Sequence, residues 1–151
     1  MDEEKINKLP PDVKKQFLKL GLKLSEKKTK TKVHEDFLSF VKHVWPEFIE
    51  GKHHKEISKK FNDIANKKIK RLIINMPPRH TKSEFASFLL PAWMVGRKPN
   101  LKIIQTTHTT ELAIRFGRKA KTLMDSQEYK EVFKTRLRED SQAAGKWETE
   151  Q

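Results

Sequence analysis

A lysine and a hydroxyl residue, Lys82 and Ser83, end a short basic loop. The loop follows an apolar run at 72–74 and precedes a stretch with helical spacing of apolar residues, 84–95. In a phosphate-binding loop, backbone N–H groups face the phosphates, the lysine adds a positive charge near the β- and γ-phosphates, and the following hydroxyl ligates Mg²⁺. The pattern therefore predicts a site for ATP and Mg²⁺, with Lys82 catalytic and Ser83 reaching the metal that the nucleotide carries.

The loop departs from the usual pattern G-x-x-x-x-G-K-[ST], because Met76 and Thr81 occupy the two glycine positions. Thr81 is the more consequential departure, since a β-branched residue is penalised at positive φ. A Lys-Ser pair that merely opens an amphipathic helix in a lysine-rich chain is the alternative interpretation. The residues expected to bind the nucleotide are Pro77, Pro78, Arg79, His80, Thr81, Lys82 and Ser83.

The elements around the loop predict an α/β fold. The apolar run at 72–74 is typical of a buried strand, and a second such run follows at 101–107. A helix over 84–95, which Pro91 should kink or end, separates the two runs, and another helix is expected over 110–124. The order strand, loop, helix, strand, helix predicts a right-handed crossover and an incomplete P-loop NTPase-type parallel sheet with flanking helices.

The segment Met76-Pro-Pro-Arg-His-Thr-Lys-Ser83 resembles the variant Walker A loop of the large terminase subunit of tailed bacteriophages. Further matches lie on both sides of the loop. They are Trp45-Pro46, His53-His54, Pro91-Ala92-Trp93, Glu111-Leu112-Ala113, Arg115-Phe116-Gly117-Arg118 and the closing run 140–151. The resemblance implies an ATP-driven motor that packages double-stranded viral DNA. It also implies a homo-oligomeric ring, a portal protein and a small terminase subunit as partners of the full-length protein.

The same resemblance suggests roles for residues beyond the lysine and serine. Arg79 matches an arginine finger within the loop, which would act on charge in the transition state, and an ordinary phosphate clamp is the alternative. Trp45, His53 and His54 would lie on the adenine side, although simple core packing also explains Trp45. A metal site among the histidines at 34–54 is conceivable, but their spacing matches no specific motif.

The later parts of a terminase are not recognisable in the sequence. A P-loop ATPase needs a carboxylate at the end of a later apolar strand, and no acidic residue after the loop follows a run of four apolar residues. The acidic clusters of a two-metal nuclease are missing as well. We therefore expect 33–151 to be the amino-terminal portion of a P-loop ATPase domain, without Walker B strand or nuclease domain and inactive on its own.

The residues before the ATPase portion predict a basic helical arm and linker over 1–32. A helical pattern with one apolar face begins after Pro10, and 25–32 reads as a basic linker without apolar anchors. The apolar pattern predicts a further helix over 37–44. The resemblance suggests another helix over 55–66, opened by one of the two histidines at 53 and 54.

The formal net charge of +13 and the isoelectric point near 9.9 favour a polyanionic partner, and nucleic acid is the natural one. Arg115, Arg118 and Lys119 recur along the helix expected at 110–124 and could contact DNA, although any exposed helix of a basic protein shows this pattern. Residues 106–109, rich in threonine, are interpreted as a helix cap.

The chain has no cysteine, which excludes disulfides and thiolate metal sites. No apolar stretch approaches the roughly 20 residues needed to cross a membrane, and the acidic start at 1–4 lacks the plan of a secretory signal. The sequence thus predicts a soluble intracellular protein without a membrane partner, and the resemblance to a phage protein implies the cytoplasm of the infected bacterium. Two other classes stay open: another P-loop ATPase such as a helicase, and a non-enzymatic basic DNA-binding module.

Overall fold

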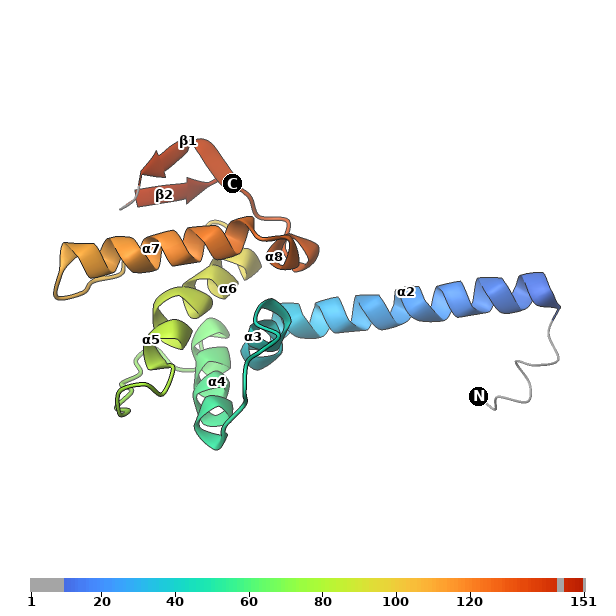
Figure 1. Cartoon of the computed structure of the whole chain (residues 1–151), viewed down its shortest axis with the longest axis horizontal. Coiled ribbons are helices and arrows are strands. Elements are labelled where there is room, and N and C mark those ends of the chain that lie inside the picture. Colours follow the sequence, from blue (N-terminus) through green and yellow to red (C-terminus); the bar gives the residue numbers. More distant parts are fainter. Residues whose placement is uncertain (1–9, 144–145, 151) are drawn as a thin grey trace. The chain divides into compact units, whose positions relative to one another are not determined.

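The computed structural model describes residues 10–143 and 146–150, the side chains of 139–143 and 146 excepted. Its contacts separate two compact units, Met1–Thr31 and Lys32–Gln151. Helices make up most of the described chain, and the strands are confined to one hairpin (Figure 1). Residues 1–9 of the expected arm, and 144, 145 and 151 of the closing run, lie outside the described residues.

Helix α2 (Pro11–Glu35) begins where the helical pattern predicts but continues through the expected linker. The prediction of a linker at 25–32 is therefore wrong. This stretch contains no glycine or proline, and lysine and glutamate are good helix formers even without apolar anchors. The hydroxyls of Thr29 and Thr31 donate to the carbonyls of Ser25 and Lys27, 3.0 and 2.9 Å away, which is how a helix accommodates threonine.

Helices α3 (Phe37–Val44) and α4 (Lys52–Ala65) follow in the second unit. The bounds of α3 are those expected, and α4 begins three residues earlier than the helix that the resemblance suggested. Asp36 caps α3 by accepting from the backbone N–H of Ser39 at 2.8 Å. Asn62 of α4 accepts from the N–H of Phe37 at 2.9 Å and donates to Asp36 at 2.8 Å, so one amide joins the two helices.

The helical run after the loop consists of α5 (Lys82–Glu84), the π-helical segment η1 (Phe85–Leu89) and α6 (Leu90–Arg97). The expected effect of Pro91 takes the form of this π turn, since the helix does not end there. Proline lacks an N–H and its ring crowds the carbonyl four residues earlier. The wider turn just before it, in which the Leu90 N–H donates to the Phe85 carbonyl, accommodates the ring.

Helix α7 (Thr110–Asp125) matches the expected helix, and the short α8 (Gln127–Val132) was not expected. Thr109 caps α7 by accepting from the N–H of Leu112 at 3.3 Å, as the cap interpretation predicts. Ser126 ends α7 and caps α8 by accepting from the N–H of Tyr129 at 3.3 Å.

The core of the second unit is aromatic and centres on Phe37. Its ring meets Phe61, Phe85 and Trp93 edge-on, with ring centroids 5.2 to 5.4 Å apart. The indole N–H of Trp93 donates to the carbonyl of Val33 at 3.3 Å. These contacts bring α3, α4 and the helical run after the loop together, and so fix the position of the loop itself.

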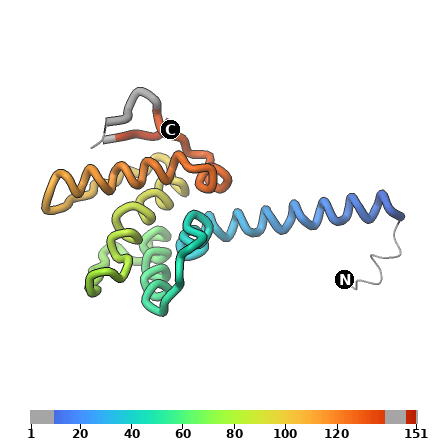
Figure 2. The backbone as a smooth tube through the Cα atoms, viewed as in Figure 1, coloured from blue at the N-terminus to red at the C-terminus, as the bar shows by residue number. Residues whose placement is uncertain are grey.

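The prediction of an α/β fold with a parallel sheet is wrong. Neither expected strand, at 72–74 or at 101–107, pairs with another segment, and the strands of the described chain are β1 (Leu137–Ala143) and β2 (Lys146–Thr149). These two pair antiparallel beside α7. Figure 2 shows both expected strands as loops between helices.

Burial explains why these runs are not strands. Leu72 and Ile74 pack against the core, but Ile73 between them is 87% exposed and Ile104 is 91% exposed. A buried parallel strand needs neighbours that cover both faces and pair its backbone, and the described chain supplies none. A short apolar run indicates burial of some side chains and does not reveal whether a partner strand exists.

Candidate phosphate-binding loop

Residues 76–83 comprise a tight turn at 78–81 and the first two residues of α5, which follows the turn directly. Two of its residues adopt the left-handed conformation, Arg79 with φ 63° and Thr81 with φ 56°. Thr81 occupies the position where the usual motif has glycine, for which this conformation carries no steric penalty. The carbonyl of Thr81 then accepts the first helical hydrogen bond, from the N–H of Phe85 at 2.9 Å. The backbone at Thr81 thus takes the left-handed conformation that glycine adopts most readily.

The side chain of Lys82 folds back over the loop. Its ammonium group donates to the carbonyl of Met76 at 3.2 Å, six residues earlier. Lys82 is half-buried, whereas Ser83 in the first helical turn is exposed. The lysine therefore spans the loop from its last residues to its first.

The remaining residues expected to bind nucleotide lie on the solvent side of the same turn. Pro77, Pro78, Arg79 and His80 are exposed. His80 donates from Nδ1 to the carbonyl of Pro78 at 2.8 Å, which closes the turn. The seven residues predicted from the sequence thus occupy the turn and the start of α5, and Thr81 and Lys82 are half-buried while the other five are exposed.

His54 joins α4 to this turn. The N–H of Gly51 donates to Nδ1 of His54 at 2.9 Å, so the proton of the neutral ring is on Nε2. Nε2 donates to the hydroxyl of Thr81 at 2.5 Å, and that hydroxyl donates to the carbonyl of His80 at 2.7 Å. Burial and, after it, the neighbouring His53 lower the pKa of His54, which favours this neutral form.

The structure places the other two residues expected on the adenine side, His53 and Trp45, in different surroundings. The His53 ring lies 3.8 Å from that of His54 and 5.6 Å from that of His80, and its Nε2 is buried without a hydrogen bond. Trp45 is linked to His54 through Phe48, whose ring lies 5.5 Å from the Trp45 ring and 4.8 Å from the His54 ring. The histidines adjoin the loop, and Trp45 packs at the edge of the core.

Of the residues predicted to contact DNA, Lys119 has a role within the fold. Its ammonium group pairs with Glu84 at 3.0 Å and lies 5.1 Å from the centre of the Phe88 ring, so it ties α7 to the helical run after the loop. Arg115 and Arg118 are exposed on α7. They line an open pocket of about 1020 Å³ whose lining also includes the acidic residues Glu111 and Glu128.

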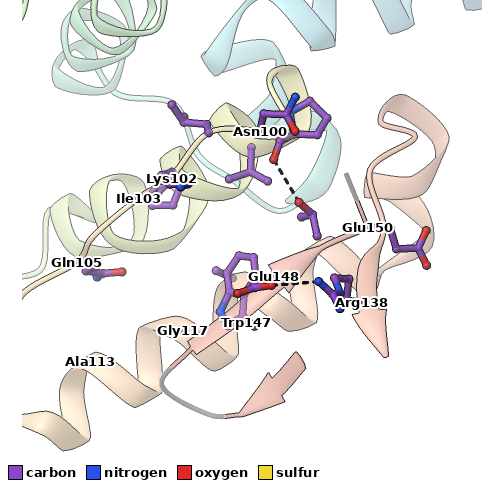
Figure 3. Close-up of a pocket in the computed structure, with 16 residues that line it drawn as sticks. Asn100, Lys102, Ile103, Gln105, Ala113, Gly117, Arg138, Trp147, Glu148 and Glu150 are labelled. Atoms are coloured by element: carbon purple, nitrogen blue, oxygen red, sulfur yellow. Dashed lines mark hydrogen bonds and ion pairs between the residues drawn. The ribbon is translucent and has the colours of Figure 1, made fainter. Parts of the chain in front are cut away.

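A second pocket, of about 1050 Å³, lies between the segment 99–105, α7 and the hairpin (Figure 3). Arg138 and Glu148 pair across the hairpin at 3.3 Å, and the hydroxyl of Thr149 donates to the carbonyl of Pro99 at 3.2 Å. Its lining, as far as the described residues define it, includes none of the residues expected to bind nucleotide. The second apolar run thus borders a cavity instead of a sheet.

The side chains of the loop have chemical groups that suit a polyphosphate ligand. Lys82 and Arg79 are cationic, and Ser83 offers an oxygen that could ligate Mg²⁺ carried by the phosphates. Among the described residues no cluster of three or more His, Cys, Asp or Glu could hold a metal ion, so the histidines at 34–54 form no such site. In the same part of the chain no helix is long and apolar enough to span a membrane.

Comparisons with protein-family models, with curated proteins and with solved structures find no match for this chain. The functional argument therefore rests on the loop itself. Sequence reasoning missed the contact between His54 and Thr81 and the pair of Glu84 with Lys119, which join residues 27 and 35 positions apart. No local sequence pattern links residues so far apart. The sequence did single out Thr81, because it occupies a glycine position, where a positive φ penalises a β-branched residue.

Proposed function

We propose that residues 76–83 bind the phosphates of ATP with Mg²⁺, as part of the large terminase subunit of a tailed bacteriophage. One arrangement carries the proposal: Lys82 reaches back to the Met76 carbonyl, and Thr81 takes the left-handed conformation of the missing glycine. This arrangement supports the proposal because it holds the ammonium group against the loop, where it would meet the phosphate oxygens of a bound nucleotide. The support comes from the loop and its helix, since the described chain lacks the parallel sheet that was expected around them.

The roles of the loop residues follow from their chemistry. Lys82 would neutralise charge on the β- and γ-phosphates, and Ser83 would ligate the Mg²⁺ that bridges them. Arg79, exposed at the tip of the turn, would reach the γ-phosphate. The motor role, the packaged DNA, the ring, portal and small-subunit partners and the location in an infected bacterial cytoplasm all rest on the resemblance of the loop and its flanks.

Binding of Mg-ATP tests the proposal directly. We expect the unmodified chain to bind a fluorescent ATP analogue in the presence of Mg²⁺ and Lys82→Ala to bind it at least about tenfold more weakly, because removing a charge-assisted contact costs about 1.5–3 kcal/mol. Lys98→Ala is the matched control, since Lys98 is an exposed lysine just beyond the end of α6. Equal affinities of the two variants would contradict the proposal.

The role of Arg79 requires turnover in addition to binding. An arginine finger acts on charge that develops during transfer, so Arg79→Ala would lower kcat while leaving nucleotide affinity nearly unchanged. A phosphate clamp would lose affinity instead. The comparison is made in the longest form of the protein that hydrolyses ATP.

The net charge of +13 favours a second candidate, a non-enzymatic basic DNA-binding module. Such a module would bind DNA with an affinity indifferent to Lys82→Ala and would not bind Mg-ATP. The same two binding measurements therefore separate the candidates. Another P-loop ATPase such as a helicase would share the nucleotide result and differ in lacking any association with packaging partners.

A further inference from the structure

The turn contains a conformational problem at Thr81. Its φ of 56° and ψ of 9° lie in the left-handed region, which crowds the Cβ of every residue except glycine and is least suited to a β-branched side chain. Arg79, two positions earlier, is left-handed as well. Residues in such conformations persist only where their surroundings hold them. Some contact must therefore hold Thr81.

The contact is the hydrogen-bond chain through His54. Gly51 donates to Nδ1, Nε2 donates to the Thr81 hydroxyl, and that hydroxyl donates to the His80 carbonyl. Each group has one partner of the required kind, so the chain has a single direction. This chain of hydrogen bonds holds the Thr81 hydroxyl through His54 and, through that hydroxyl, the carbonyl of the preceding peptide at His80.

The imidazole is itself held firmly. His54 is 94% buried, and its ring lies 4.8 Å from the Phe48 ring and 5.1 Å from the Phe85 ring. Phe85 belongs to the helical run that the loop starts, and His54 belongs to the first turn of α4. The ring therefore packs between Phe48, in the segment before α4, and Phe85, in the helical run that the loop starts.

We propose that His54 is a positioning residue that holds Thr81 in the left-handed conformation, so that the turn takes its phosphate-binding shape without glycine. The inference rests on the proposed function, because it assigns His54 to the support of that same loop. His54 contacts the Thr81 hydroxyl, which in turn donates to the His80 carbonyl, and His54 needs no contact with the nucleotide. The free-energy cost of a non-glycine residue in the left-handed conformation at position 81 is offset by one buried side chain, His54, which belongs to a separate helix.

A double-mutant cycle tests this role, because glycine at position 81 needs no support. Mg-ATP binding is measured for the unmodified chain, His54→Ala, Thr81→Gly and the double variant. We expect His54→Ala alone to weaken binding by about tenfold, the equivalent of the strain at one such residue. In the Thr81→Gly background the same change should have little effect. An equal loss in both backgrounds would overturn the proposal.

Further measurements keep loss of folding apart from loss of positioning. Far-UV circular dichroism and thermal melting of each ligand-free variant report the fold, and His54→Gln, which preserves bulk and a donor, should bind more tightly than His54→Ala. NMR of Thr81 in ligand-free His54→Ala reports its backbone directly. A left-handed Thr81 without His54 would overturn the proposal whether or not nucleotide binds, whereas failure of the unmodified chain to bind Mg-ATP would count against the proposed function alone.

Discussion

Asp36 organises the junction of α3 and α4 with three hydrogen bonds. Its carboxylate accepts from the N–H of Ser39 at 2.8 Å, from the Ser39 hydroxyl at 2.7 Å and from the Asn62 amide at 2.8 Å. Burial by itself would raise the pKa of Asp36, but the bonds from Ser39 and Asn62 and the charge of Lys32 lower it overall. The ionised carboxylate is therefore the form that stabilises the fold.

The lowered pKa predicts how the stability contributed by Asp36 depends on pH. Since the folded pKa lies below the unfolded value of 3.8, the contribution is fully present above pH 3.8 and is lost as the pH falls through the folded pKa. We expect Asp36→Ala to lower the free energy of unfolding by about 1–2 kcal/mol at pH 7. Urea denaturation at a series of pH values should show the gap to the unmodified chain closing in acid.

Asp36→Asn is the matched control for this titration. Asparagine is a good helix cap, so it should cost less than alanine at pH 7, and it cannot ionise. Its difference from Asp36→Ala should consequently be the same at every pH. A gap between the unmodified chain and Asp36→Ala that stays constant down to pH 2 would refute the assignment.

Single residues of the loop could be identified from the sequence, and their supports could not. The residues around Lys82 predict a phosphate-binding loop, and Thr81 at a glycine position left open either a permitted conformation or strain. In the structure Thr81 adopts a left-handed φ of 56°. His54 lies 27 positions earlier and was expected on the adenine side. Nothing in its neighbourhood indicates that it would reach Thr81, because such a contact depends on how α4 packs.

At the scale of elements, periodicity identified the helices well. The bounds of α3 agree with the pattern, α7 differs by one residue, and Thr109 caps α7 as expected. The strands failed for a different reason, since a strand exists only if another segment pairs with it, and an apolar run carries no information about that partner. The hairpin was missed because β1, Leu-Arg-Glu-Asp-Ser-Gln-Ala, has little apolar alternation.

Gly96 shows how tightly α6 packs against the last helix. A Cβ at this position would come within 2.6 Å of the Phe133 ring and of the Tyr129 hydroxyl. Tyr129 cannot easily move, because it is fully buried and its hydroxyl donates to the Ala92 carbonyl at 2.8 Å. We expect Gly96→Ala to lower the free energy of unfolding by about 1–3 kcal/mol through overpacking, measured by urea denaturation.

Gly21→Ala adds the same methyl group at a position where no neighbouring atom crowds it. A Cβ on Gly21 would meet no atom within 4 Å, and α2 would gain about 0.5–1 kcal/mol from the better helix former. Slower amide hydrogen exchange in α2 is the expected result. If Gly96→Ala were as harmless as Gly21→Ala, the close packing of α6 with Tyr129 and Phe133 would be incorrect.

For the whole molecule, positive charge is the dominant property. The chain has 33 Lys and Arg against 20 Asp and Glu, and residues 11–31 hold seven lysines against two acids. Some of this charge is paired within the fold, as in the contacts of Glu50 with both Lys42 and Lys55. The remainder covers both units, so an interaction with a polyanion should be spread over much of the surface.

This distribution predicts DNA binding that is strongly salt-dependent and largely indifferent to base sequence. Lysine neutralises phosphates as a point charge, and each contact releases condensed counterions. With about six phosphate contacts, affinity should fall by about 10³ between 50 and 200 mM salt. Fluorescence anisotropy with two duplexes of equal length and unrelated sequence measures both properties, and a marked preference for one duplex would contradict the prediction.

The contribution of α7 to DNA binding can be measured separately from the effect of the overall net charge. Replacing Arg115 and Arg118 with alanine removes two exposed charges from one helix, and replacing Lys59 and Lys60 with alanine removes two from α4. If α7 contacts the phosphates, the arginine variant alone should lower the slope of log K against log salt by about two. Equal effects of the two variants would assign the binding to overall charge, because a diffuse field does not distinguish which helix loses its cations.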